Sequence, residues 1–226
     1  MMKSKDTIVR RQMFTPATLR VREWGDGEAL SRTIEGYAIL FNTPSAPLWQ
    51  DEDSEAREVI DPSAVTRELL DGCDIKMTMF HNRQMLLARS NNGKGTLSYE
   101  VDDKGVKFKF EAPATQHGDE ALELIRRGDI GGCSFMFSTR YYDEACVERT
   151  AKAAGGITVI TYRVKAITGI YDFTVTDNPA YPDTSVEARE LIKELREPEP
   201  PVGKEENERK VREQVREMRR AATLSL

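Results

Sequence analysis

Short segments in which apolar and polar residues alternate, or in which β-branched and aromatic residues gather, recur from Thr18 to Pro182. Successive side chains of a strand point to opposite faces, so a period of two is typical of half-buried β-strands. The sequence therefore predicts strands over residues 18–24, 32–42, 74–81, 85–89, 95–103, 105–113, 133–144, 157–169 and 170–182.

Two segments have the pattern of helices instead. Residues 61–72 begin with an Asp-Pro pair, a common helix start, and end at Gly72. Residues 117–132 place apolar side chains on one helical face and have Gly128 as a stop signal. Many short strands with few helices favour a mostly antiparallel β-sheet that is closed, or nearly closed, into a barrel.

The composition of the chain changes after Pro182. Residues 183–226 are rich in Glu, Arg and Lys, have almost no aromatic residues and are interrupted by a Pro-rich stretch at 197–203. Few apolar positions are available to dock this segment, so we expect a charged helix or a disordered tail. The predicted organisation is an N-terminal arm over 1–17, one globular domain over 18–188 and a charged C-terminal helix or tail over 189–226.

Charge and hydropathy argue against two classes of partner. The 226 residues include 33 Lys and Arg against 38 Asp and Glu, a net charge of −5, so the chain has no overall attraction for DNA or RNA. No apolar run approaches the roughly 18 residues of a membrane-spanning helix, and no signal-peptide core follows the N-terminal basic residues. We therefore expect a cytosolic protein that binds neither nucleic acid nor membrane.

Metal and disulfide chemistry is not indicated either. The three cysteines, Cys73, Cys133 and Cys146, form no CxxC pair, and the histidines that could join them are His81 and His117. Three reduced thiols in a cytosolic protein explain this pattern. We expect no metal ion and no organic cofactor.

Three residues on separate predicted strands could form a catalytic constellation. His81 ends an apolar strand and opens a polar loop, where an imidazole can act as a general base. Ser134 follows two glycines and a cysteine, and the tight approach of the glycines can expose a hydroxyl and direct N–H groups at an oxyanion. Asp172 lies among apolar residues and needs a partner such as an imidazolium. His81 and Ser134 also have ordinary structural explanations, so only the geometry of all three can identify a catalytic site.

The neighbouring thiol offers a second nucleophile. Cys133 could replace Ser134, but alternation places Cys133 on the same face as Phe135 and Phe137, toward the core. A buried thiol is therefore the better explanation, and a hydrolase that uses Cys133 is the less favoured alternative.

The order of these motifs closely resembles the caudovirus prohead protease family, serine proteases that mature the procapsids of tailed bacteriophages. The similarity spans about residues 19–188 and rests on GYAILFN, EVIDPSAV, MFHN, RRGDIGGCSFMF and YDFTVTDNPAYPDTSV. The family's histidine and serine correspond to His81 and Ser134, and Asp172 stands where the family usually has a glutamate. Met136 replaces the usual glycine two residues after the serine.

This resemblance implies a fold, an activity and partners. The fold would be mainly β with α, a small, mostly antiparallel β-barrel surrounded by helices and distantly similar to herpesvirus assemblin. The chain would be a serine endopeptidase with Ser134 as nucleophile, His81 as general base and Asp172 orienting the histidine. It would cleave the scaffolding segment of the major capsid protein and its own tail inside the prohead that assembles in the host cytoplasm. A homodimer, as in the assemblin relatives, is also implied.

Two questions stay open at the level of sequence. The oxyanion donors could be backbone N–H groups near Gly132 to Phe135 or an arginine such as Arg140. The alternative function is a non-catalytic capsid-assembly or scaffold protein that uses the same barrel for binding. In that case the serine, the histidine and the aspartate need not converge.

Overall fold

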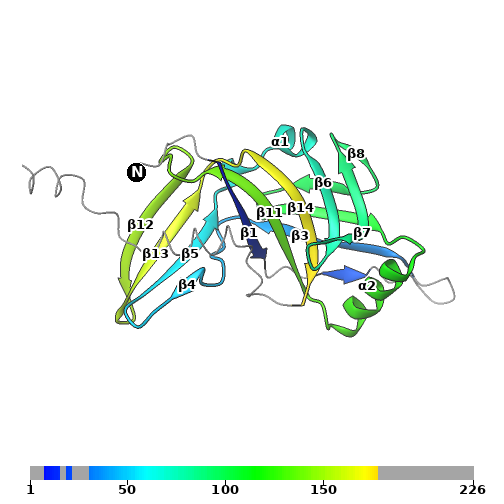
Figure 1. Cartoon of the computed structure of the whole chain (residues 1–226), viewed down its shortest axis with the longest axis horizontal. Coiled ribbons are helices and arrows are strands. Elements are labelled where there is room, and N and C mark those ends of the chain that lie inside the picture. Colours follow the sequence, from blue (N-terminus) through cyan, green and yellow to red (C-terminus); the bar gives the residue numbers. More distant parts are fainter. Residues whose placement is uncertain (1–7, 16–18, 22–30, 178–226) are drawn as a thin grey trace, which may run out of the picture. The chain divides into compact units, whose positions relative to one another are not determined.

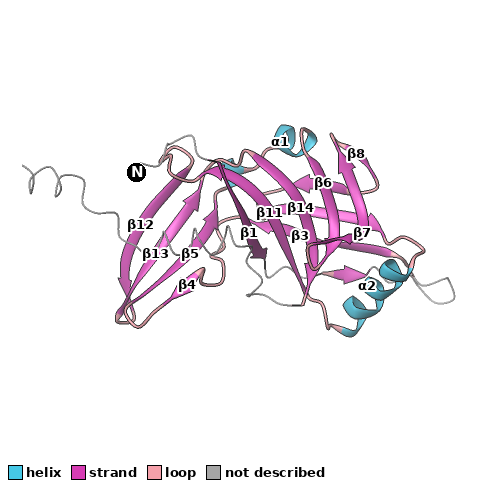
Figure 2. Ribbon diagram, in the orientation of Figure 1, coloured by secondary structure: helices cyan, strands magenta, loops and turns pink. Residues whose placement is uncertain are grey.

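Three β-sheets make up most of the described chain (Figure 1, Figure 2). The computed structural model describes residues 8–15, 19–21 and 31–177, and all of them belong to one unit that spans Met1–Ala188. The predicted C-terminal tail lies outside the described residues. The chain is mainly β where it is described, as predicted.

The first sheet has six strands in the order β1-β11-β14-β6-β7-β8. Its strands are β1 (Ile8–Thr15), β6 (Asp74–Met79), β7 (Asn82–Asn91), β8 (Lys94–Gly95), β11 (Gly132–Arg140) and β14 (Gly169–Thr176). β14 and β6 run parallel, and the other neighbouring pairs in this sheet are antiparallel. β1 lies within the segment predicted as an N-terminal arm and pairs with β11 over its whole length.

The second and third sheets have four strands each, in the orders β2-β3-β10-β9 and β12-β13-β5-β4. The second contains β2 (Arg20–Val21), β3 (Thr33–Leu40), β9 (Ser98–Val101) and β10 (Gly105–Glu111). The third contains β4 (Trp49–Gln50), β5 (Ser54–Ile60), β12 (Val147–Ala154) and β13 (Ile157–Val164), of which β13 and β5 run parallel. An isolated bridge from Phe41 to Ile60 connects the chain after β3 to β5.

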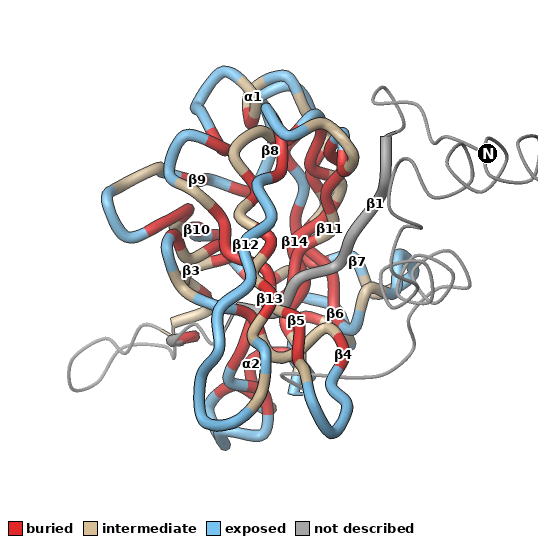
Figure 3. Tube along the Cα trace, turned by 90° about the vertical axis from the view of Figure 1, so that its left-hand side faces the viewer, coloured by how far each residue is buried: buried red, intermediate tan, exposed pale blue. Residues whose placement is uncertain are grey.

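The apolar core lies between the first and second sheets, where β11 contacts β3. Buried apolar side chains of the first sheet include Met77, Met79, Cys133, Phe135, Phe137, Phe173 and Val175, and those of the second include Ile34, Phe108 and Phe110. Figure 3 shows the contrast between the buried strands β11 and β14 and the exposed strand β12. Because one face of the first sheet packs in this core, its opposite face is available for polar side chains.

A closed barrel is not found among the described residues. The strand order of each sheet runs from one edge strand to another, and no sheet closes on itself in this part of the chain. Helices are also few, because α1 (Arg67–Asp71), α2 (Gln116–Arg127) and one 3-10 helix are all that the described ranges contain. The second sheet covers the apolar face of the first, so the core does not depend on the predicted surrounding layer of helices.

The sequence signals predicted the end of one helix correctly and missed a break within the other. The segment predicted as one helix over 61–72 forms a 3-10 helix (Pro62–Ala64) and α1, separated by Val65 and Thr66, both in an extended conformation. α2 ends at Gly128 as predicted, where a φ of 81° is the left-handed conformation that glycine adopts without strain. Two β-branched residues thus mark the break, and the second of them, Thr66, is the N-cap of α1.

Candidate active site

His81 lies in a tight turn between β6 and β7. Phe80 and His81 form a two-residue connection, with Met79 paired to Asn82 across it, and both turn residues have positive φ, 53° and 55°. This is the type I′ arrangement of short hairpins, which usually takes Asn and Gly. For residues other than glycine this backbone region costs about 1–3 kcal/mol each, so surrounding contacts have to hold the turn.

Contacts from β14 hold this turn. The backbone N–H of Phe80 donates to the carbonyl of Val175 at 3.1 Å, and the N–H of His81 donates to the hydroxyl of Thr174 at 2.9 Å. The Thr174 hydroxyl also donates to the carbonyl of Thr78 and accepts from the Thr78 hydroxyl, both at 3.0 Å. The turn is thereby attached to the middle of the first sheet.

Ser134 and Asp172 lie on neighbouring strands, on the face of the first sheet that is turned away from the core. Both are buried, with exposures of 7% and 5%. The antiparallel register pairs Ser134 with Thr174 and Met136 with Asp172. Because directly opposed residues share a face of a sheet, the hydroxyl and the carboxylate are on the same side.

A β-bulge in β14 directs Asp172 to this side. The register pairs Phe137 with Ile170, which leaves Tyr171 as an extra residue between two ordinary pairs. Ile170 and Phe173 are both buried in the core, and strict alternation from Ile170 would have directed Asp172 there too. The extra residue shifts the alternation by one position, in the way that bulges beside active sites redirect a side chain.

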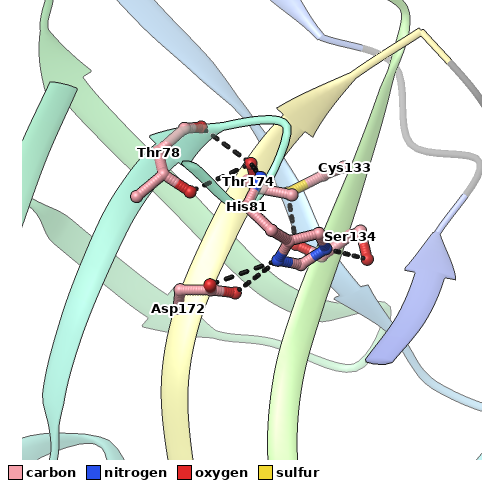
Figure 4. Close-up of polar contacts among 6 residues, drawn as sticks. All are labelled: Thr78, His81, Cys133, Ser134, Asp172 and Thr174. Atoms are coloured by element: carbon pink, nitrogen blue, oxygen red, sulfur yellow. Dashed lines mark hydrogen bonds and ion pairs between the residues drawn. The ribbon is translucent and has the colours of Figure 1, made fainter. Parts of the chain in front are cut away.

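The three side chains form one continuous set of contacts (Figure 4). His81 Nδ1 lies 3.0 Å and 3.1 Å from the two carboxylate oxygens of Asp172, and His81 Nε2 lies 2.9 Å from Ser134 Oγ. An ionised carboxylate can only accept, so this arrangement favours a proton on Nδ1 and leaves Nε2 to accept the serine proton. The structure thus brings together all three residues singled out in the sequence, and the aspartate is long enough to reach the imidazole.

A separate group of charges flanks Asp172 on β6 and β7. Lys76 is the register partner of Asp172, but its ammonium lies 2.7 Å from a carboxylate oxygen of Asp74. The other carboxylate oxygen of Asp74 binds Arg89 at 2.6 Å. Hydrogen bonds from Arg89 and then Lys76 lower the pKa of Asp74 to about 2. Both cations are therefore engaged with Asp74, and it is Asp172 that contacts His81.

The other residues considered from the sequence are placed less favourably. Cys133 is fully buried on the core face of β11, and burial raises the pKa of its thiol. Arg140 follows Ser134 by six residues on the same strand, a distance of about 20 Å that its side chain cannot bridge. β11 pairs with β1 and β14 on its two sides, so its N–H groups around the serine face these strands. His117 lies on α2, where its Nδ1 is 3.8 Å from Glu120.

Two residues of the site escaped the sequence-based prediction. Thr174 follows Asp172 by two positions and lies on the same face of β14, a spacing that could have identified it. Thr78 precedes His81 by three positions, but its contact with Thr174 depends on the parallel pairing of β14 with β6. That pairing is not visible in the sequence.

Neither a metal cluster nor a membrane-spanning helix is found in the described part of the chain. No set of three or more His, Cys, Asp or Glu side chains there is grouped so that it could hold a metal ion. None of the helices described is both long enough and apolar enough to cross a bilayer.

One protein family matches most of the chain. The family model described as caudovirus prohead serine protease matches residues 17–197. Among solved structures, the capsid assembly protease gp21 of bacteriophage T4 is similar over 77% of this chain and 100% of that chain, with a TM-score of 0.40 and 9% sequence identity. No curated protein matches this chain. Because this family model matches most of the chain, the chain belongs to the caudovirus prohead serine proteases.

Proposed function

We propose that this protein is the serine endopeptidase that matures a phage prohead, with Ser134, His81 and Asp172 as its catalytic residues. The observation that carries the proposal is the continuous contact from Asp172 through His81 to Ser134, 3.0 Å at Nδ1 and 2.9 Å at Nε2. Such an arrangement places a general base beside a nucleophile and orients the base by a third group. Membership of the prohead serine protease family supports the same reaction class.

The proposed reaction begins at the Ser134 hydroxyl. His81 Nε2 accepts the hydroxyl proton as Oγ attacks the scissile carbonyl carbon, and Asp172 stabilises the imidazolium that forms. The tetrahedral intermediate collapses to an acyl-enzyme as the imidazolium donates its proton to the leaving amine. Water then gives a proton to the same imidazole as it attacks the ester carbonyl carbon. The C–Oγ bond breaks as the imidazolium returns that proton to Ser134 Oγ, which releases the carboxylic acid product. None of these steps requires a metal ion or an organic cofactor.

The proposed substrates are the scaffolding segment of the major capsid protein and the protease's own C-terminal tail. Cleavage would take place inside the prohead as it assembles in the host cytoplasm. The family supports the first substrate. The sequence over 189–226 supports the second, because its charged and Pro-rich composition is typical of undocked segments whose backbone a protease can reach.

Co-expression with the major capsid protein of the same phage tests this function. We expect intact-mass measurement to show a capsid protein shortened by its scaffolding segment and a protease shortened within residues 189–226. Both products follow from hydrolysis of peptide bonds that the protease can reach. If both proteins keep their full masses after assembly, the proposal is wrong.

The alternative is a scaffold protein that uses the same sheets for binding alone. Binding does not require a strained two-residue turn that holds an imidazole 2.9 Å from a buried hydroxyl. The convergence of the serine, the histidine and the aspartate therefore favours hydrolysis over a purely structural role.

A Cys133→Ala variant is expected to process the capsid protein at close to the wild-type rate. The thiol faces the core and burial raises its pKa, so the thiolate that would act as a nucleophile is scarce. Loss of the buried sulfur should lower the free energy of unfolding by about 1–2 kcal/mol. Intact-mass time courses and urea unfolding measure the two effects. A folded variant that retains Ser134 but no longer processes its substrate would assign the nucleophile to the thiol instead.

A further inference from the structure

The hydroxyl of Thr174 is fully used and fully buried. A hydroxyl has one proton to donate and two lone pairs that accept. Thr174 Oγ1 donates to the Thr78 carbonyl and accepts from the Thr78 hydroxyl and the His81 N–H, at 3.0, 3.0 and 2.9 Å. Both threonines have an exposure of 0%. Solvent therefore cannot easily replace these hydrogen bonds if the Thr174 hydroxyl is removed.

β14 holds His81 at two points. Asp172 binds the imidazole at Nδ1, and Thr174, two residues further along the strand, binds the backbone N–H of the same histidine. Thr174 is also the register partner of Ser134 on β11. One strand thus fixes both the ring and the main chain of the histidine beside the serine (Figure 4).

We propose that Thr174 is a positioning residue for His81, an inference that rests on the catalytic role proposed for that histidine. Phe80 and His81 lie in the left-handed backbone region, which such residues occupy only where surrounding contacts impose it. Without the Thr174 hydroxyl, the His81 N–H loses its acceptor and the turn relaxes. Fewer molecules then have the imidazole in place to accept the proton of Ser134, and the reaction slows accordingly.

The test measures how fast a fluorophosphonate reacts with the full-length protein. In this reaction Ser134 Oγ bonds to phosphorus, the P–F bond breaks and fluoride leaves, while His81 accepts the hydroxyl proton. The rate therefore reports the alignment of serine and histidine without a peptide substrate. We expect Thr174→Val to lower the second-order rate constant about 10- to 100-fold, because it leaves the backbone N–H of His81 without its hydrogen-bond acceptor. Thr174→Ser keeps the hydroxyl and should react nearly as fast as the wild type.

Thr139→Val is the matched control. Thr139 lies on β11, has an exposure of 0%, and donates a hydrogen bond of 2.7 Å to the carbonyl of Ala166. Valine at this position also removes a buried hydroxyl, but not one that contacts the histidine turn. The control should lose stability to urea, though less than Thr174→Val because one hydrogen bond is removed instead of three, and should keep the wild-type rate constant.

The outcomes separate this inference from the proposed function. If the wild type reacts and Thr174→Val reacts equally fast, or if Thr174→Ser is as slow as Thr174→Val, the positioning role is wrong while Ser134 stays the proposed nucleophile. If the wild type does not react at all, the proposed function fails, and this inference fails with it. Should the valine variant not fold, Thr174→Ala removes the same hydroxyl without a branched side chain and is expected to give the same loss.

Discussion

A Ser134→Ala variant is expected to lose processing of the major capsid protein by roughly 10⁴-fold or more. Alanine lacks the Oγ atom that lies 2.9 Å from His81 Nε2 and forms the acyl-enzyme. The neighbouring Cys133 faces the core and is not placed to substitute for it. The change removes a single small polar group, so the variant should fold. The intact mass of co-expressed capsid protein, followed over time, measures the loss.

Ser90→Ala is the matched control for this experiment. Ser90 lies on β7, is 1% exposed and donates a hydrogen bond of 3.3 Å to the Tyr99 hydroxyl, so alanine again removes a buried serine hydroxyl. Its contacts do not include the histidine or the aspartate of the site, and we expect wild-type processing. If the Ser134→Ala variant also processes the capsid protein at the wild-type rate, Ser134 is not the nucleophile.

An Asp172→Asn variant is expected to lose activity by roughly 10³- to 10⁴-fold. Asparagine has nearly the same shape, but its amide N–H would donate to His81 Nδ1, where carboxylate oxygens now accept. The ring proton would then lie on Nε2, which faces Ser134 Oγ and could no longer accept the serine proton. The imidazolium would also lose its stabilising charge. The rate of capsid processing measures the loss, and thermal unfolding shows whether the variant is folded.

Asp74→Asn separates the effect of the tautomer from the effect of charge. This substitution also removes one negative charge, on a strand next to that of Asp172. The carboxylate that is lost binds Lys76 and Arg89. Processing at the wild-type rate is expected for this variant. Equal losses in the two variants would trace the effect to net charge, and wild-type processing by folded Asp172→Asn would show that the aspartate does not orient the histidine.

Strands with clear alternation were predictable, whereas strands with another pattern were not. β3, β10, β11 and β13 lie where the alternation of apolar and polar residues placed them. β5 and β12 were missed. β5 buries two charged residues, Glu55 and Glu58, and β12 is exposed at every position after Val147. Neither has the alternation of a half-buried strand. β5 buries Ala56, Val59 and Ile60 as well as its glutamates, and β12 depends on its pairing with β13.

The residues of the candidate site could be chosen from the sequence, but their geometry could not. Residue type and local context were enough to single out His81, Ser134 and Asp172. The bulge at Tyr171 directs the carboxylate away from the core. In the sequence it appears only as two consecutive apolar residues, Ile170 and Tyr171, ahead of the alternation from Asp172 to Thr176, and such a pair does not by itself indicate a bulge. The parallel pairing of β14 with β6 brings the histidine turn beside the serine strand, and such pairings result from tertiary packing rather than from local pattern.

The position of the covalent adduct formed with a fluorophosphonate tests the catalytic assignment most directly. The folded, full-length protein is allowed to react, digested, and analysed by tandem mass spectrometry. We predict a single adduct, on Ser134, that is absent when the protein is heat-denatured before reaction, because the reactivity of this hydroxyl depends on the His81 imidazole 2.9 Å away. An adduct on any other residue, or a folded protein without an adduct on Ser134, would contradict that assignment.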